Sequence, residues 1–170
     1  MTNKMRDIRI EKLTLNFGAG KDQDKLAKGI KLLEMVAGKP PVKCITKKRI
    51  PTWGLRPGLP VGCKVTLRKK AAHELLVKLL KARENLTTDH FDNFGNLSFG
   101  ILEYMDIEGM KYDPEIGMIG FQVCVTFEKP GYRVKRRKLH SKEIGKNHVI
   151  TKGDAIQYVK NNFKIEVVEK

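Results

Sequence analysis

Apolar and polar residues alternate with a period of two along three stretches of the chain, residues 9–18, 61–68 and 117–128. The apolar positions are Leu13, Leu15, Phe17, Cys63, Val65, Leu67, Phe121, Val123, Val125 and Phe127. The positions between them carry polar or small side chains: Lys12, Thr14, Asn16, Lys64, Thr66, Arg68, Gln122, Cys124 and Thr126. This alternation predicts strands that bury one face and expose the other. A fourth strand is expected over residues 96–107, and a short extended piece over residues 40–46, where two prolines disfavour a helix.

A period near 3.6 residues predicts three helices. The first is expected from about Asp24 to a stop at Gly38, with one apolar face formed by Leu26, Ile30, Leu33 and Ala37. The second is expected over residues 71–83. The third is expected over residues 154–163, with Asp154 as a candidate N-cap.

Together these elements predict an α+β fold in a single domain, residues 1–170. An antiparallel sheet would be covered by helices on one face and open to solvent on the other. The open face would show hydroxyls, amides and cations, from Thr14, Asn16, Lys64, Thr66, Arg68, Gln122 and Thr126. Such groups bind phosphate, ribose hydroxyls and base edges. Two long connections are expected outside the sheet, a projecting loop over residues 47–62 and a basic loop over residues 129–150.

Positive charge is concentrated in two parts of the chain. The formal net charge is +15 for 170 residues, which indicates a polyanionic partner. Ten basic residues and no acid lie between Met35 and His73. Eight basic residues and the single acid Glu143 lie between Arg133 and Lys152. The two stretches carry +17 and the remainder −2, a distribution that favours two phosphate-binding patches over general solubility.

Patterns typical of enzymes, metal sites and membranes are absent from the sequence. Residues 16–22, NFGAGKD, contain a G-x-G-K fragment, but Leu15 stands where a P-loop needs glycine, and Asp22 where it needs serine or threonine. His140 and His148 are eight residues apart and fit no common zinc spacing. Cys44, Cys63 and Cys124 are an odd, widely spaced set and suggest structural thiols in a reducing cytoplasm. The sequence therefore predicts no cofactor, no metal, no small-molecule substrate and no membrane partner.

Four blocks of sequence resemble the L-five family of large-subunit ribosomal proteins, which bind 5S rRNA. They are IEKLTLNFGAG, LLEMVAGKPPVKCITKKR, GLRPGLPVGCKVTLR and FGNLSFGI, in the order that the family has them. The basic segment from Tyr132 to Ile150 resembles the archaeal and eukaryotic branch. At Lys39 the bacterial members would have glutamine, and a lysine there is compatible with a phosphate contact in its place.

The resemblance implies a structural, non-enzymatic role in the central protuberance of the large subunit, ribosome-bound in the cytoplasm. The implied partners are 5S rRNA, large-subunit rRNA, peptidyl-site tRNA, a protein of the small-subunit head and neighbouring large-subunit proteins. Residues expected to bind rRNA are Thr14, Asn16, Lys39, Lys43, Thr46, Lys47, Lys48, Lys64, Thr66 and Arg68. The tRNA would face Trp53, Arg56, Pro57 and Gly58. Secondary RNA contacts are expected from Arg133, Lys135, Arg136, Arg137 and Lys138.

Two alternatives remain open at the level of sequence, a free-standing RNA chaperone or adaptor and an RNA-modifying enzyme without a recognisable motif. For Trp53, packing within its own loop is the alternative to a contact with RNA. The segment from Arg133 to His148 has high charge and no apolar periodicity, and we expect it to be mobile until it meets RNA. A self-contained hairpin with turn residues Gly145 and Asn147 is the competing interpretation.

Overall fold

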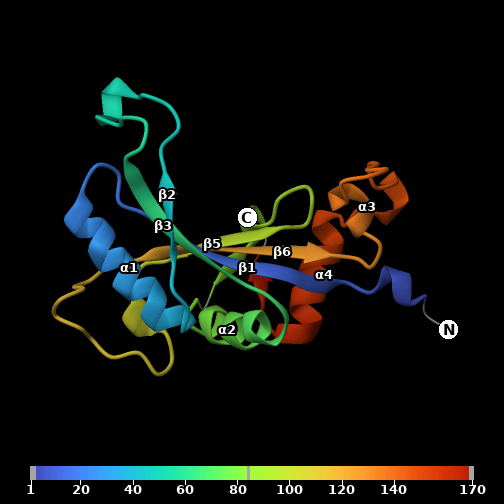
Figure 1. The fold of residues 1–170 in the computed structure, drawn as a ribbon. Coiled ribbons are helices and arrows are strands. Elements are labelled where there is room, and N and C mark those ends of the chain that lie inside the picture. Colours follow the sequence, from blue (N-terminus) through green and yellow to red (C-terminus); the bar gives the residue numbers. More distant parts are fainter. Residues whose placement is uncertain (1–2, 84, 169–170) are drawn as a thin grey trace.

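A computed structural model describes residues 3–83 and 85–168 and contains a five-stranded antiparallel sheet (Figure 1). The strand order is β2-β3-β1-β6-β5. These strands span Val42–Ile45 (β2), Pro60–Leu67 (β3), Arg9–Gly18 (β1), Phe121–Glu128 (β6) and Leu97–Ile101 (β5). A separate two-stranded parallel sheet pairs Leu86–Thr87 (β4) with Val167–Val168 (β7). The α+β class and the antiparallel sheet predicted from the sequence are confirmed.

Among the described residues, four helices accompany the sheet: Gln23–Ala37 (α1), Lys69–Lys81 (α2), Arg133–Arg136 (α3) and Lys152–Phe163 (α4). Short 3-10 turns occupy Lys4–Arg6, Pro51–Trp53, Thr88–His90, Tyr104–Asp106 and Lys146–His148. The three longer helices, α1, α2 and α4, contribute buried residues to one apolar core with the sheet. In Figure 1, α2 lies below the sheet, whereas α3 and the turn before β5 lie above it.

The core face of the sheet consists of the apolar residues that the alternation predicted. Leu13, Leu15, Cys63 and Val123 are completely shielded from solvent, and the other alternating apolar residues of β1, β3 and β6 are at most 4% exposed. Burial raises the pKa of the Cys63 thiol to about 11, with a smaller contribution from Cys44, so Cys63 stays protonated at neutral pH. A buried thiol of this kind acts as a small apolar side chain.

Helix α1 lies directly on β1 at Gly29, which is why a glycine stands in the middle of a helix. A side chain at this position would overlap the ring of Phe17. Helix propensity alone would favour alanine by about 1 kcal/mol, so the glycine reflects the packing requirement.

We therefore expect Gly29→Ala to lower the free energy of unfolding by about 1–3 kcal/mol, because the overlap forces the helix or the ring to move. Urea denaturation followed by circular dichroism measures this change. The matched control is Gly153→Ala in α4, where a new Cβ meets nothing closer than 4.0 Å; that variant should be neutral or more stable. A stabilised Gly29→Ala protein would contradict the close packing of α1 on β1.

Several predicted element boundaries were wrong. The strand expected over residues 117–128 begins only at Phe121, and the helix expected over residues 71–83 spans Lys69–Lys81. Helix α4 begins at Lys152 with Thr151 as its N-cap, and Asp154 instead occupies the third helical position of a capping box. Desolvation opposes ionisation of Asp154, but hydrogen bonds from the Thr151 N–H and from the Lys129 ammonium outweigh it, so the pKa of Asp154 lies below its ordinary value. The expected strand over residues 96–107 ends at Ile101, and the chain then turns to bury Tyr104, whose hydroxyl accepts a hydrogen bond from the Asp113 N–H at 2.8 Å.

Candidate nucleic-acid interface

The uncovered face of the sheet carries two rows of small or polar side chains that run across the strands. Directly opposed residues of antiparallel strands lie on the same face, so the strand register defines both rows. The first row is Val42, Lys64, Asn16, Gln122 and Gly100, and the second is Thr66, Thr14, Cys124 and Ser98. We call these nine residues the open face.

The open face contains no acidic residue. Glycine, threonine, serine and cysteine make up most of it, so a bulky ligand can approach the sheet closely. The amide of Asn16 donates a hydrogen bond to the Gln122 amide oxygen at 3.3 Å. Lys64 is exposed in the first row, and Arg68 is exposed directly after β3 ends. Hydroxyls and amides beside unopposed cations are the groups that bind phosphate and ribose.

Strand register places one predicted rRNA-binding residue on the other face of the sheet. Lys43 lies opposite Cys63, whose thiol points into the core, and not opposite Lys64. Its side chain is exposed because β2 is an edge strand. The sequence missed this because the short β2 has no clear alternation. Lys43 is therefore not part of the open face, although a contact with RNA beyond the sheet edge stays a prediction.

The other predicted residues of this region lie at the two ends of β2: Lys39 in the connection from α1, and Thr46, Lys47 and Lys48 in the connection to β3. Lys39, Lys47 and Lys48 are exposed. Thr46 has a structural role, because its hydroxyl donates to the Leu59 carbonyl at 2.7 Å and its N–H donates to the same oxygen at 2.9 Å; its contact with RNA stays a prediction. These bonds close the base of the loop.

The connection between β2 and β3 projects away from the sheet (Figure 1). Its boundaries are narrower than the predicted 47–62, because β3 already begins at Pro60. Leu55 is buried and pairs with Ile50, so the loop has a small anchor of its own. Trp53 is 69% exposed, so the interpretation that it packs within its own loop is wrong. Arg56, Pro57 and Gly58 are exposed beside it.

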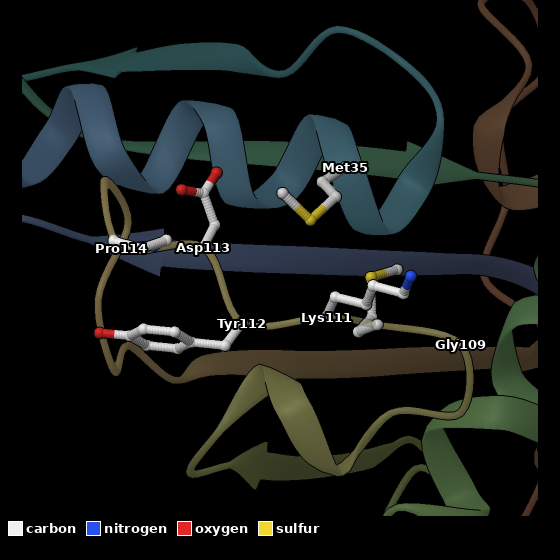
Figure 2. A pocket seen from close by; sticks show the side chains of 7 residues that line it. Met35, Gly109, Lys111, Tyr112, Asp113 and Pro114 are labelled. Atoms are coloured by element: carbon white, nitrogen blue, oxygen red, sulfur yellow. The ribbon is translucent and has the colours of Figure 1, made fainter.

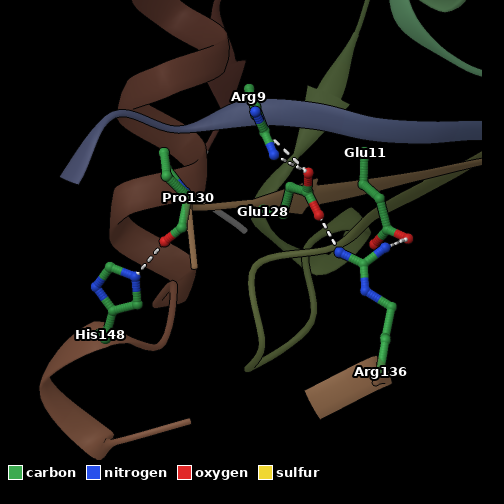
Figure 3. A network of polar contacts seen from close by, with 6 residues as sticks. All are labelled: Arg9, Glu11, Glu128, Pro130, Arg136 and His148. Carbon is green, nitrogen blue, oxygen red and sulfur yellow. Dashed lines mark hydrogen bonds and ion pairs between the residues drawn. The ribbon is translucent and has the colours of Figure 1, made fainter. Parts of the chain in front are cut away.

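The predicted basic loop, residues 129–150, contains the short helix α3 and is tied to the sheet by ion pairs (Figure 3). Glu128, only 7% exposed, accepts hydrogen bonds from Arg9 and Arg136. The distance from Arg9 Nη2 to Glu128 Oε1 is 2.7 Å. Arg136 also contacts Glu11, with 2.6 Å between Nη1 and Oε1. We call these four residues the ionic clasp.

The far end of the same segment is fixed by hydrogen bonds. The Tyr132 hydroxyl donates to the His148 carbonyl at 3.1 Å and accepts from the Ile150 N–H at 3.0 Å. The His148 ring donates from Nε2 to the Pro130 carbonyl at 2.8 Å (Figure 3). Burial raises the pKa of Tyr132, so the hydroxyl remains a neutral donor. The segment thus follows a defined path in which Arg133, Lys135, Arg137 and Lys138 remain exposed.

Comparison with known proteins gives the family. The family model described as "Ribosomal protein L5" matches residues 3–56, and the model of the C-terminus of the same ribosomal family matches residues 60–158. The chain belongs to the ribosomal protein L5 family. Proteins named "Large ribosomal subunit protein uL5" match nearly all of it. The relative from Methanococcus maripaludis strain C6 is 46% identical, covering 98% of this chain and 94% of the relative.

Two further archaeal relatives carry the same name. The one from Nanoarchaeum equitans is 44% identical over 99% of this chain and 100% of its own length. The one from Sulfurisphaera tokodaii is 43% identical over 98% of this chain and 96% of its own length. The resemblance to the archaeal branch is therefore confirmed. As a member of the L5 family, the chain is a structural, non-enzymatic protein of the large ribosomal subunit, ribosome-bound in the cytoplasm.

The cavity between α1 and residues 109–114 has a volume of about 560 Å³ and is lined by Met35, Lys111, Tyr112 and Asp113 among others (Figure 2). Its lining has one carboxylate and one ammonium, and no nucleophile beside a base. Within residues 3–83 and 85–168, no group of three or more His, Cys, Asp or Glu is arranged to hold a metal ion. No helix in the same residues is long and apolar enough to span a membrane.

The ionic clasp is the part of the interface that sequence reasoning missed. Arg136 was predicted to contact RNA, yet its guanidinium is held by two carboxylates, Glu11 and Glu128. Nothing in the linear pattern signals pairing between residues 125 positions apart. A contact of Arg136 with RNA stays a prediction, and its role in this structure is to hold α3 against β1 and β6.

Removing the central carboxylate of the ionic clasp should release α3. We expect Glu128→Gln to speed amide hydrogen exchange over residues 133–142 at least tenfold. We also expect it to lower the free energy of unfolding by about 1–3 kcal/mol, because two guanidinium groups lose a buried, charged acceptor. Hydrogen exchange of the RNA-free protein measures this. The control is Glu115→Gln, which breaks an exposed ion pair with Lys31 and should leave exchange over residues 133–142 unchanged, because exposed ion pairs contribute little. Equal exchange in the Glu128→Gln and unmodified proteins would show that the ionic clasp does not order the segment.

Proposed function

We propose that this protein binds 5S rRNA through its open face and so anchors that RNA, together with large-subunit rRNA, in the central protuberance. The observation that carries the proposal is the acid-free open face, with Lys64 within it and Arg68 at its edge. An RNA backbone that follows the rows meets hydroxyl and amide donors in the middle of the sheet and cations near β3. Because the side chains are short, phosphates and ribose hydroxyls can come within hydrogen-bonding distance of the strands.

The projecting loop has a separate task in this proposal. It carries exposed Trp53 and Arg56 at a distance from the open face (Figure 1). A tryptophan stacks on bases, and an arginine pairs with phosphate. We assign this loop to peptidyl-site tRNA. In this proposal, a protein of the small-subunit head and neighbouring large-subunit proteins bind exposed surface outside the open face and the projecting loop.

Recovery of the native protein with its bound RNA tests the proposal. Large subunits are dissociated in stages, the protein is isolated by affinity under low salt, and its RNA is sized and sequenced. A single RNA of 5S size is the expected result. A heterogeneous RNA pool would instead favour a free-standing chaperone or adaptor. Isolation without any RNA under conditions that keep other ribosomal complexes intact would overturn the proposal.

A further inference from the structure

Phe94 is a large aromatic side chain held in solvent by a rigid turn. It is 71% exposed. The Asp92 carboxylate accepts hydrogen bonds from the Phe94 N–H at 2.9 Å and from the Asn96 N–H at 2.7 Å. The Asn96 side-chain amide donates to the other oxygen of the same carboxylate at 2.7 Å. The backbone around Phe94 is therefore fixed before any ligand binds.

The turn is also fixed from the side of the core. Gly95 has a φ of +75°, and a Cβ there would lie 2.5 Å from Cγ2 of the buried Ile150. Gly95 thus permits both the left-handed backbone and close packing against Ile150. An exposed aromatic ring does not by itself require a backbone that is restrained by hydrogen bonds and by packing. The support suggests that the position of Phe94 itself matters.

A cleft of about 630 Å³ opens beside Phe94, between the sheet and the basic segment. Lys12 and Thr126, which pair across β1 and β6 in line with the open face, form its floor. Asn96 lines it from the same turn as Phe94, and Lys135 and Arg136 line it from α3. The volume lies within the range of sites for small ligands, about 300–1,000 Å³. The ionic clasp sets the width of the cleft because it fixes α3.

The lining of the cleft matches the parts of a nucleotide. Phe94 offers a π-face for a base, and Lys12 and Lys135 offer ammonium groups for a phosphate. Thr126 and Asn96 also line the cleft and can bond the ribose or the base edge. Two carboxylates also line the cleft: Glu11 is neutralised by Arg136, and Glu143 is exposed. A purely apolar partner would bury the ammonium groups of Lys12 and Lys135 without supplying a negative charge, which is energetically costly.

We propose that this cleft binds one unpaired nucleotide of the RNA on the open face, with its base stacked on Phe94. The inference rests on the proposed function, because the floor of the cleft continues the open face. It adds a base-stacking position to an interface that otherwise contacts the backbone. Stacking needs an unpaired base, so the nucleotide belongs to a loop or a bulge. No residue between Phe91 and Asn96 was expected from the sequence to contact RNA.

The test is a filter-binding titration of the full chain with deproteinised 5S rRNA and, separately, large-subunit rRNA, at several salt concentrations. We expect Phe94→Ala to weaken binding of 5S rRNA roughly 5- to 100-fold, as for loss of one stacked base, and to leave binding of large-subunit rRNA unchanged. The dependence on salt should be unchanged, because every phosphate interaction remains. Phe94→Trp should retain affinity, since its ring also stacks. Lys135→Ala should instead reduce the salt slope by about one unit.

The control for Phe94 is Tyr112→Ala, which removes another exposed aromatic ring (54% exposed) from the loop beside α1. It should leave both titrations unchanged. Unchanged affinity of Phe94→Ala, in a protein whose open-face variants do lose affinity, would overturn this inference alone. A loss that Phe94→Trp does not restore would also overturn it, since stacking would not be the cause. If the unmodified protein bound neither RNA, the proposed function and this inference would fail together.

Discussion

Replacing Thr66 and Arg68 together by alanine is expected to weaken 5S rRNA binding by roughly 10- to 100-fold while the protein stays folded. A charge-assisted hydrogen bond contributes about 1.5–3 kcal/mol, and the hydroxyl adds a smaller amount. Both side chains are exposed, and the core residues on either side of Thr66, Val65 and Leu67, are at most 4% exposed. The substitutions therefore do not touch the core, and the far-ultraviolet circular dichroism should be unchanged.

The salt dependence of this double variant separates a direct interaction with phosphate from a general decrease in charge. Removing one phosphate interaction lowers the slope of log affinity against log salt by about one unit. A matched control is Lys78→Ala, which removes one exposed positive charge from α2, on the opposite side of the sheet. Lys78→Ala should leave affinity and slope nearly unchanged. If both variants bound equally weakly, net charge and not the open face would explain binding.

The strands could be predicted because burial on one face of a sheet leaves a period-two pattern in the sequence. That pattern correctly assigned the two faces of β1, β3 and β6. It gave no face for the residues of β2, which has only four residues and is partly shielded only at Cys44, so that Lys43 could be placed only from the strand register. It also overextended β5, because the pattern cannot tell a strand residue from one, such as Tyr104, that is buried by a turn.

The basic segment was harder to predict because its order comes from distant partners. High charge without apolar periodicity predicts a mobile loop. In the structure, Arg136 meets Glu11 and Glu128, and Tyr132 meets the backbone near Ile150. These contacts depend on the three-dimensional position of each group, and no local pattern encodes them. The mobility of the segment in solution stays a prediction, which the exchange of the Glu128→Gln variant addresses.

Substitution of Trp53 and Arg56 by alanine is the change we expect to separate tRNA handling from 5S rRNA binding. Both side chains are exposed on the projecting loop, whereas the buried Leu55 and the bonds of Thr46 hold its shape and remain intact. Removal of one stacking group and one phosphate-binding group should speed dissociation of peptidyl-site tRNA about tenfold or more. Ribosomes reconstituted with the variant, followed by the release of labelled tRNA, provide the measurement.

The same variant should bind 5S rRNA as the unmodified protein does, because the loop extends beyond the ends of β2 and β3 (Figure 1) and its residues belong to neither row of the open face. Replacing the whole of residues 51–60 by a glycine and serine linker is a harsher test. That change also removes Leu55 and Pro60, whose carbonyl accepts a hydrogen bond from the Gln23 side chain at 3.2 Å. The double substitution is therefore the cleaner comparison, since it removes only exposed groups.

A fall in 5S rRNA affinity as large as that of Thr66→Ala with Arg68→Ala would mean that the loop and the open face bind one RNA together. Unchanged tRNA release would mean that the loop serves a different partner.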